Sequence, residues 1–220
     1  MKRRLESRVW PNTDSGLVFP ECQDGRPSTG VCFSGGGTRS YAATIGQLRG
    51  LAEIGLLERI GYVSAVSGGA WAATAHAYYA GPGQTNGEIL GAVSRPEELD
   101  AAALSRLSES ELGIAATRDF RQTLMSLHHS PAVAADRIWG QAGGETFLSP
   151  FGLFEAERPQ AFTLDSVSSE EIRIRNPAIG PLHEVRKGRE APYLITHATL
   201  NWPSDSDTAA RKVGFEYSPL

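Results

Sequence analysis

The sequence has few cysteines, no long apolar run and no excess of positive charge. Two cysteines in 220 residues are too few for a disulfide framework, and without a histidine cluster they are too few for a structural zinc site. The formal net charge of −4 gives no general attraction for nucleic acid. No stretch reaches the roughly 18 apolar residues of a membrane-spanning helix. We therefore expect a cytoplasmic location, no nucleic-acid partner, and only local recognition of phosphate or lipid.

Glycine, in contrast, is abundant. The chain has 24 glycines, about 11% of its residues against a usual value of ~7%. Two clusters are informative: residues 34–39 read Ser-Gly-Gly-Gly-Thr-Arg, and residues 65–69 read Ala-Val-Ser-Gly-Gly. Each cluster follows a short apolar segment typical of a strand and precedes a segment typical of a helix. Both clusters are therefore predicted to be strand-to-helix turns.

The pattern along the chain predicts an α/β fold. Residues 1–29 are rich in proline and polar residues, and we interpret them as an irregular N-terminal arm. From residue 30 the predicted order is strand, turn, helix, strand, turn and helix, which is typical of a mainly parallel sheet with helices packed on it. Residues 82–150 lack strand-like segments and predict a helical cap region. Residues 192–200 and 213–217 predict two further strands.

The first glycine turn favours an anion-binding site. Glycine leaves backbone N–H groups open, and the helix that follows adds the unpaired donors and positive dipole end of its N-terminus. A dinucleotide-binding fingerprint would need its third glycine where Ser40 stands, and a phosphate-binding P-loop would need Gly-Lys-Ser or Gly-Lys-Thr, which the sequence lacks. An oxyanion hole is the third interpretation, and the second turn favours it.

The second turn has the features of a nucleophile elbow. A serine on a sharp strand-to-helix turn needs small neighbours two residues to either side, because the backbone there is strained and crowded. Around Ser67 these neighbours are Ala65 and Gly69; glycine is usual at the first position, so Ala65 is a mild departure. Gly37 and Ser67 are 30 residues apart, enough for one helix and one returning strand, so the two turns should lie side by side. Acyl transfer needs at least an exposed hydroxyl with hydrogen-bond donors beside it. One such donor typically lowers the activation free energy by about 3 kcal/mol.

Three segments together resemble the catalytic domain of cytosolic phospholipase A2, a relative of the patatin-like acyl hydrolases. They are residues 34–39, residues 46–51 (Gly-Gln-Leu-Arg-Gly-Leu) and residues 62–71 (Tyr-Val-Ser-Ala-Val-Ser-Gly-Gly-Ala-Trp). A weaker likeness extends to residues 150–154, 192–197 and 215–219. The resemblance implies a three-layer α/β sandwich with a mainly parallel central sheet. Residues 30–220 would form the catalytic domain, with the helical cap at about residues 82–150.

The resemblance also implies roles for individual residues. Ser67 would be the nucleophile, and Arg39 would hold the substrate phosphate. The oxyanion hole would be formed by the backbone amides of Gly35, Gly36 and Gly37, with Gly68. The implied reaction is hydrolysis of an acyl ester of a phospholipid or lysophospholipid through an acyl-serine intermediate, with transient contact to a membrane surface. The resemblance implies no metal and no other cofactor.

The catalytic base that the resemblance implies is not found. In the family an aspartate in a late Asp-Gly-Gly, Asp-Gly-Ala or Asp-Ser-Gly turn activates the serine, and no such turn follows Ser67. The one Asp-Gly pair, Asp24-Gly25, lies before the predicted sheet. We favour a truncated sequence whose base lies beyond Leu220; a catalytically dead relative and a different aspartate are the alternatives. A serine without its base loses about 10²- to 10⁴-fold in rate, so weak or no turnover is expected.

Two other interpretations stay open. An inactive relative would use the same pocket as a non-catalytic lipid-binding module. Alternatively, Ser67, Asp165 and His197 follow the chain order of a Ser-Asp-His triad in an α/β-hydrolase, although a histidine within an apolar strand is more typical of a packed core residue. Cys32, inside the first predicted strand, is also expected in the core.

Overall fold

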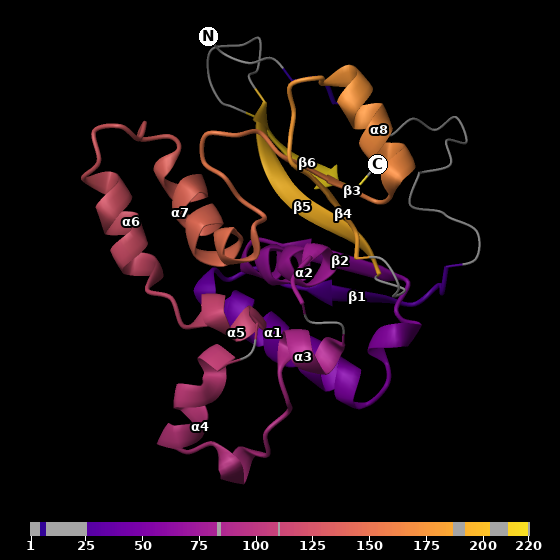
Figure 1. Cartoon of the computed structure of the whole chain (residues 1–220), viewed down its shortest axis with the longest axis vertical. Coiled ribbons are helices and arrows are strands. Elements are labelled where there is room, and N and C mark those ends of the chain that lie inside the picture. The colour runs from indigo at the N-terminus through magenta and orange to yellow at the C-terminus, as the bar shows by residue number, and fades with distance from the viewer. Residues whose placement is uncertain are drawn as a thin grey trace.

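The structure is a computed structural model, and it describes residues 5–7, 26–82, 85–109, 111–186, 192–202 and 211–219. The strands are β1 (Gly30–Phe33), β2 (Tyr62–Val66), β3 (Ala161–Thr163), β4 (Leu182–Glu184), β5 (Tyr193–Trp202) and β6 (Arg211–Tyr217). The α-helices are α1 (Thr38–Glu53), α2 (Gly68–Tyr78), α3 (Asn86–Leu90), α4 (Ala101–Ser105), α5 (Glu111–Ala116), α6 (Phe120–His128), α7 (Ile138–Phe147) and α8 (Ser166–Arg175) (Figure 1). Short 3-10 helices lie at Leu57–Arg59, Pro96–Glu98, Arg106–Glu109 and Ser149–Phe151.

The main sheet has the strand order β1-β2-β5-β6. Strands β1, β2 and β5 run parallel, and β6 returns antiparallel to β5. Strands β3 and β4 form a separate parallel pair. The predicted α/β fold with a mainly parallel sheet is confirmed, including the two strands expected after residue 190.

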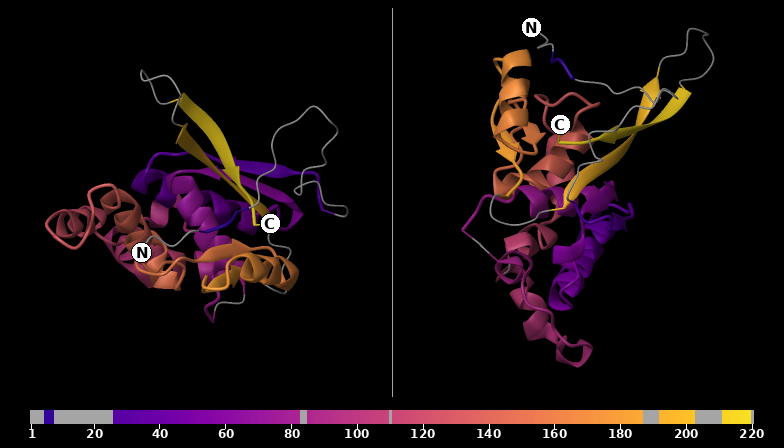
Figure 2. Two further views of the ribbon diagram at one scale, coloured as in Figure 1. Left: turned by 90° about the horizontal axis from the view of Figure 1, so that it is seen from above. Right: turned by 90° about the vertical axis from the view of Figure 1, so that its right-hand side faces the viewer.

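Helices α1 and α2 pack on the same face of the main sheet (Figure 2). Because β1, β2 and β5 are added in one direction, right-handed crossovers place both helices on one side. Alternate strand residues face these helices: Phe33, Val63 and Ala65 are all buried. Tyr41 and Leu48 of α1 are also buried. The apolar core therefore lies between the sheet and this pair of helices.

The expectation that Cys32 is a core residue is wrong. Side chains alternate between the two faces of a strand, and the neighbouring Phe33 occupies the helix side, where it is 3% exposed. Cys32 points to the opposite face and is an exposed free thiol. A four-residue apolar segment does not reveal which of its faces will be covered, because its period is too short to decide.

The stretch between β2 and β3 is mainly helical, as predicted. Helices α3 and α5 pack against α1, and α6 packs against α7. The ring of Trp71 on α2 stacks on Phe147 of α7, with ring centroids 4.8 Å apart. This stacking joins the helical region to the layer that covers the sheet. Within the described ranges, none of the helices is both long and apolar enough to cross a bilayer.

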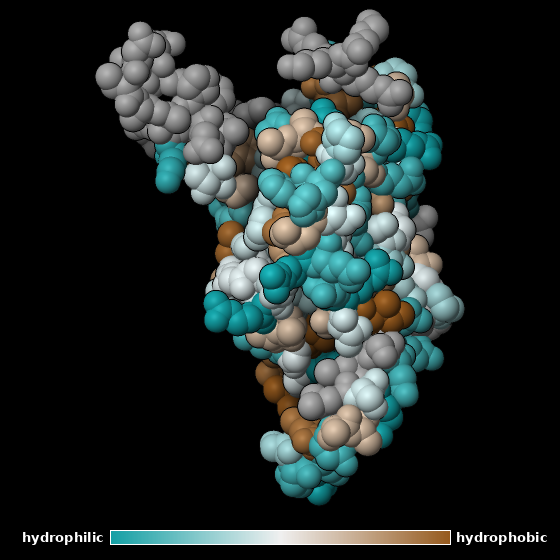
Figure 3. Space-filling view, turned by 90° about the vertical axis from the view of Figure 1, so that its left-hand side faces the viewer, coloured by the Kyte–Doolittle hydropathy of each residue, from teal (hydrophilic) through white to brown (hydrophobic). Residues whose placement is uncertain are grey.

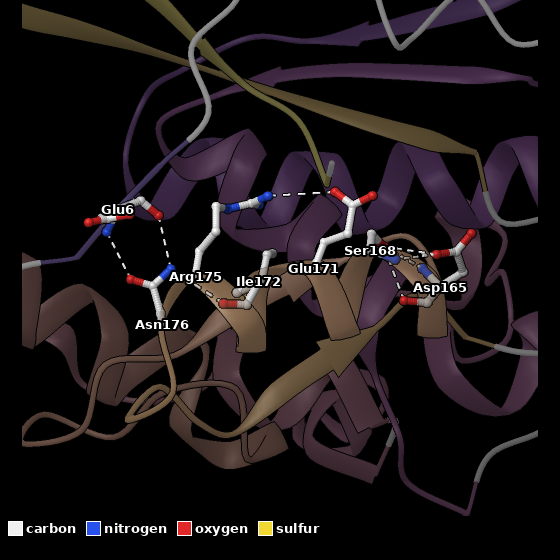
Figure 4. A network of polar contacts seen from close by, with 7 residues as sticks. All are labelled: Glu6, Asp165, Ser168, Glu171, Ile172, Arg175 and Asn176. Carbon is white, nitrogen blue, oxygen red and sulfur yellow. Dashed lines mark hydrogen bonds and ion pairs between the residues drawn. The ribbon is translucent and has the colours of Figure 1, made fainter.

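Hydrogen bonds anchor α8 at both ends (Figure 4). At the N-terminus, the Asp165 carboxylate accepts hydrogen bonds from the Ser168 amide at 2.8 Å and from the Ser168 hydroxyl at 2.9 Å. At the C-terminus, the buried Asn176 side chain accepts from the Glu6 amide at 2.8 Å and donates to the Glu6 carbonyl at 2.9 Å. The second pairing ties residues 5–7 of the predicted N-terminal arm to α8. The rest of the arm up to residue 25 lies outside the described residues.

Replacing Asp165 with alanine should destabilise the protein in a pH-dependent manner. The hydrogen bond from the Ser168 amide lowers the pKa of the Asp165 carboxyl group, so folding favours the charged form. This stabilisation is complete above the unfolded pKa of about 3.9 and disappears as the pH falls through the lower folded value. Because loss of an N-cap costs about 1 kcal/mol, urea denaturation should show that loss near neutral pH and a smaller loss at about pH 3. Asp165→Asn keeps an acceptor and should lose less; equal losses for both variants would contradict the capping role.

Candidate active site

Strands β1 and β2 end level with each other, because Phe33 pairs with Ala65 in their parallel register. The chain then enters α1 at Thr38 and α2 at Gly68. The glycine turn at residues 34–37 and the turn at Ser67 therefore lie at one edge of the sheet, where both strands end. In open α/β sheets, ligands bind at this edge. The side-by-side placement expected from the sequence spacing is present in the structure.

The two turns are in direct backbone contact. A Cβ atom on Gly68 would lie 1.9 Å from the carbonyl oxygen of Gly37, and a Cβ atom on Gly69 would lie 2.8 Å from the carbonyl oxygen of Ser34. Neither distance leaves room for a side chain, so both positions require glycine. The contact fixes how far the start of α2 lies from the glycine turn.

Ser67 has the strained backbone of an elbow. Its φ is 54° and its ψ is −130°, and among the described residues it is the one non-glycine residue with a positive φ. Such a conformation costs about 1–3 kcal/mol and persists only where the surrounding structure holds it. Ser67 is exposed, whereas Ala65 is 1% exposed. The methyl group of Ala65 is thus accommodated in the core beside the turn, where glycine is more usual.

Gly35 lies directly against Ser67. A Cβ atom on Gly35 would be 3.0 Å from the Cβ of Ser67 and 3.6 Å from its Oγ. Within the described part of the chain, no hydrogen bond engages the amides of Gly35, Gly36 and Gly37. Gly36 and Gly37 have φ values of 148° and 64°, which favour glycine. The arrangement places unpaired N–H donors beside an exposed hydroxyl, at the N-termini of two helices.

Arg39 is the second residue of α1, and it is exposed. Its side chain makes no hydrogen bond or ion pair with any other described residue. A positive charge in the first turn of a helix opposes the helix dipole, so Arg39 does not stabilise α1. An anion bound beside the glycine turn would remove this conflict. The position of Arg39 therefore suits a ligand that carries negative charge.

The structure does not assemble the alternative triad of Ser67, Asp165 and His197. Asp165 caps α8, as described above, and Nε2 of His197 lies 2.7 Å from Oγ of Ser64. The second ring nitrogen of His197, Nδ1, is 3.4 Å from a carboxylate oxygen of Glu216. Nor is His197 a packed core residue, since its side chain is 35% exposed. Ser67 makes no side-chain hydrogen bond to another described residue.

Sequence reasoning missed the chain of contacts from Ser64 through His197 to Glu216. Strand alternation indicates that Ser64 faces away from α1 and α2, but no local pattern predicts its diagonal pairing with β5. Ser64 lies within a strand that is paired on both sides, so the amides around it are used by the sheet and form no oxyanion hole. A metal site is not indicated there either, because no three His, Cys, Asp or Glu side chains gather as ligands in the described ranges.

The class of protein follows from comparison of the chain with known families. Residues 31–198 match the family model described as patatin-like phospholipase. This match covers most of the chain and includes both glycine turns. The chain therefore belongs to the patatin-like phospholipase family, and the family expected from the turns is confirmed.

Individual relatives come from the cytosolic phospholipases A2. Cytosolic phospholipase A2 zeta of Mus musculus is 32% identical over 94 residues, which cover 43% of this chain and 10% of the relative. The Homo sapiens zeta protein is 33% identical over 109 residues, covering 46% of this chain and 12% of the relative. Cytosolic phospholipase A2 beta of Homo sapiens is 40% identical over 50 residues, covering 23% of this chain and 6% of the relative. The matched part of the chain thus spans about a tenth of the length of the zeta relatives.

Two alanine substitutions should separate the turn contact from ordinary helix effects. In Gly68→Ala the new methyl group would meet the Gly37 carbonyl at 1.9 Å, so we expect a loss of about 3 kcal/mol or failure to fold. In Gly46→Ala, on α1, the new methyl group meets nothing within 4 Å, and better helix propensity should add about 0.5–1 kcal/mol. Urea denaturation of both variants measures the difference. Similar stabilities for the two variants would show that the turns are not in close contact.

Proposed function

We propose that this chain carries the nucleophile and oxyanion hole of a lipid acyl-ester hydrolase. The observation that carries the proposal is the position of Gly35, which lies against the Ser67 side chain at the start of two helices. The amides of residues 35–37 make no hydrogen bond within the described part of the chain, so they are available to a substrate carbonyl that meets the hydroxyl. Membership of the patatin-like phospholipase family supports the same chemistry.

In the proposed reaction, Ser67 Oγ attacks the carbonyl carbon of the ester. The carbonyl oxygen becomes an oxyanion, which accepts hydrogen bonds from the amides of Gly35, Gly36 and Gly37, with Gly68. The ester C–O bond then breaks, the leaving alkoxide takes the proton that the Ser67 hydroxyl has lost and is released as the alcohol, and acyl-Ser67 remains. Water hydrolyses this intermediate and releases a fatty acid. Removing one oxyanion donor from such a site costs about 2.7–4 kcal/mol, and the dipoles of α1 and α2 add to the stabilisation.

Proton transfer from Ser67 needs a base. The resemblance to the family implies an aspartate for this role, in a small-residue turn that does not follow Ser67 in this sequence. In the described ranges no carboxylate or imidazole is hydrogen-bonded to Ser67. This observation favours a second candidate function, in which the same pocket binds a lipid or fatty acid without turnover. Reactivity of Ser67 distinguishes the two functions.

The proposed substrate is a phospholipid or lysophospholipid. Arg39 follows the glycine turn and has no partner among the described residues, so its guanidinium group is available for the phosphate of a headgroup. Guanidinium groups suit phosphate because they donate two parallel hydrogen bonds. The relatives named as phospholipases support this substrate class. No metal or other cofactor has a role in the proposed chemistry.

Transient contact with a membrane surface is the proposed route by which substrate reaches the site. The helical region exposes several large apolar side chains, namely Val93, Leu99, Ile114, Met125 and Trp139. Figure 3 shows apolar residues scattered among hydrophilic ones on the side of the molecule that carries α6. Scattered apolar groups favour weak, reversible contact over stable insertion. Together with the cytosolic relatives, this supports a cytoplasmic protein that visits membranes.

A fluorophosphonate probe tests the nucleophile. We expect the folded chain to be labelled at Ser67 and Ser67→Ala to be unlabelled. Hydrolysis of a short-chain p-nitrophenyl ester should depend on Ser67 but stay about 10²- to 10⁴-fold below the rate of a site with its base. Ser64→Ala is the matched control and should keep full labelling, although Ser64 is hydrogen-bonded to His197. No labelling of Ser67 in the folded chain would favour the lipid-binding module, and hydrolysis at ordinary enzyme rates would reveal a base.

Substitution of Arg39 tests the phosphate contact. Arg39→Gln removes the charge, so binding of a short-chain phospholipid should weaken about tenfold or more, as expected for loss of a charge-assisted hydrogen bond of ~1.5 kcal/mol or more. Labelling of Ser67 by the uncharged fluorophosphonate should keep its rate. Arg121→Gln, at an exposed position of α6, is the control and should leave both measurements unchanged. Equal phospholipid binding by wild type and Arg39→Gln would exclude the assigned role.

A further inference from the structure

Ser40 lies beneath the glycine turn without contacting the proposed substrate position. It belongs to the first turn of α1 and is 9% exposed. Its hydroxyl donates a hydrogen bond to the carbonyl oxygen of Ser34, the residue that precedes the three glycines. A Cβ atom on Gly36 would lie 3.3 Å from the Cβ of Ser40. The side chain of Ser40 therefore packs against Gly36 and is hydrogen-bonded to Ser34, the residue before the glycines.

The hydrogen bond from Ser40 fixes the orientation of one peptide group. In a trans peptide the carbonyl and the following N–H lie in one plane and point in opposite directions. The peptide that carries the Ser34 carbonyl also carries the Gly35 N–H. That carbonyl points toward Ser40 on α1 and lies close to Gly69 on α2. The Gly35 N–H therefore points away from Ser40 and from Gly69.

The two ends of the turn are held differently. At the far end, the Gly37 carbonyl accepts a hydrogen bond from the Tyr41 amide at 3.0 Å, which any residue at position 41 except proline would supply. At the near end, the Ser34 carbonyl accepts its hydrogen bond from a side chain, the Ser40 hydroxyl. The glycines between these ends have no Cβ to restrict their backbone angles. Without the Ser40 hydroxyl, the peptide between Ser34 and Gly35 would lose the contact that orients it.

We infer that Ser40 is a positioning residue that directs the Gly35 amide toward the oxyanion. The inference rests on the proposed acyl transfer at Ser67. Ser40 acts through the Ser34 peptide and touches neither the nucleophile nor the substrate. Loss of the Ser40 hydroxyl should therefore destabilise the transition state and leave the bound ester unaffected, because the oxyanion exists only in the transition state and in the tetrahedral intermediate.

Three variants test the inference by kinetics. In Ser40→Ala, kcat for Ser67-dependent ester hydrolysis should fall about 10- to 100-fold with KM unchanged, less than the roughly 10²- to 10³-fold loss for removal of a whole donor. Binding of a trifluoromethyl ketone, which forms an oxyanion on the serine, should weaken by a similar factor, while binding of the uncharged ester, which carries no oxyanion, should not change. Ser40→Thr restores the hydroxyl and should recover most of the activity. Ser126→Ala, at an exposed position of α6, is the control for serine-to-alanine changes in a helix.

A second measurement does not depend on turnover. Amide NMR spectra of Ser40→Ala should show shifted or broadened signals for Gly35 and Gly36, with signals of β1 and α2 unchanged, and Ser40→Thr should resemble wild type. Unchanged Gly35 and Gly36 signals in Ser40→Ala would overturn the inference, as would a kcat loss that Ser40→Thr does not recover. If wild type and Ser67→Ala hydrolyse the ester equally, the proposed function fails, and the NMR comparison still decides whether Ser40 orients the turn.

Discussion

The contact between the Gly37 carbonyl and the Cα of Gly68 is the constraint on which the candidate site depends. The register of β1 and β2 ends both strands at one edge, but strands about 4.8 Å apart still leave loops free to diverge. Because Gly68 has no side chain, the first turn of α2 packs directly against the turn that precedes α1. The Ser67 side chain is thereby placed beside Gly35. One turn supplies the hydroxyl and the other supplies the unpaired amides, so neither is useful without the approach of the other.

The same contact explains how a strained serine persists. A positive φ at Ser67 is unfavourable by about 1–3 kcal/mol, and the exposed Ser67 side chain recovers little of that through burial. The residues around it are fixed: Ala65 is buried in the sheet and Gly69 lies against Ser34. Behind them, Trp71 stacks on Phe147 and holds α2 to the helical region. The core thus determines the backbone of the elbow, and the serine conformation follows from it.

Sequence patterns predicted the features that depend on backbone conformation. The glycine turns, the elbow at Ser67 and the parallel strands each need particular residue types at fixed spacing, so they are visible locally. Contacts between distant side chains were not predictable. Asn176 binds the backbone of Glu6 across 170 positions, and His197 pairs diagonally with Ser64. Such partners are chosen by the packing of whole elements. The hydrogen bond from Ser40 to Ser34 was not predictable either, because it depends on the path of the turn between them.

Two helix N-termini and a run of free amides make this edge favourable for negative charge before any base is considered. The field would stabilise an oxyanion, a fatty-acid carboxylate or a phosphate alike, so hydrolysis and simple lipid binding share one physical basis. Acyl transfer adds a separable requirement, removal of the Ser67 proton, which contributes about 10²- to 10⁴-fold. Electrostatic stabilisation of the oxyanion usually contributes more to the rate than proton transfer does. In the proposed reaction the described residues would therefore serve mainly to stabilise the oxyanion, and the role inferred for the Ser40 hydroxyl is to orient one donor to it, the Gly35 amide.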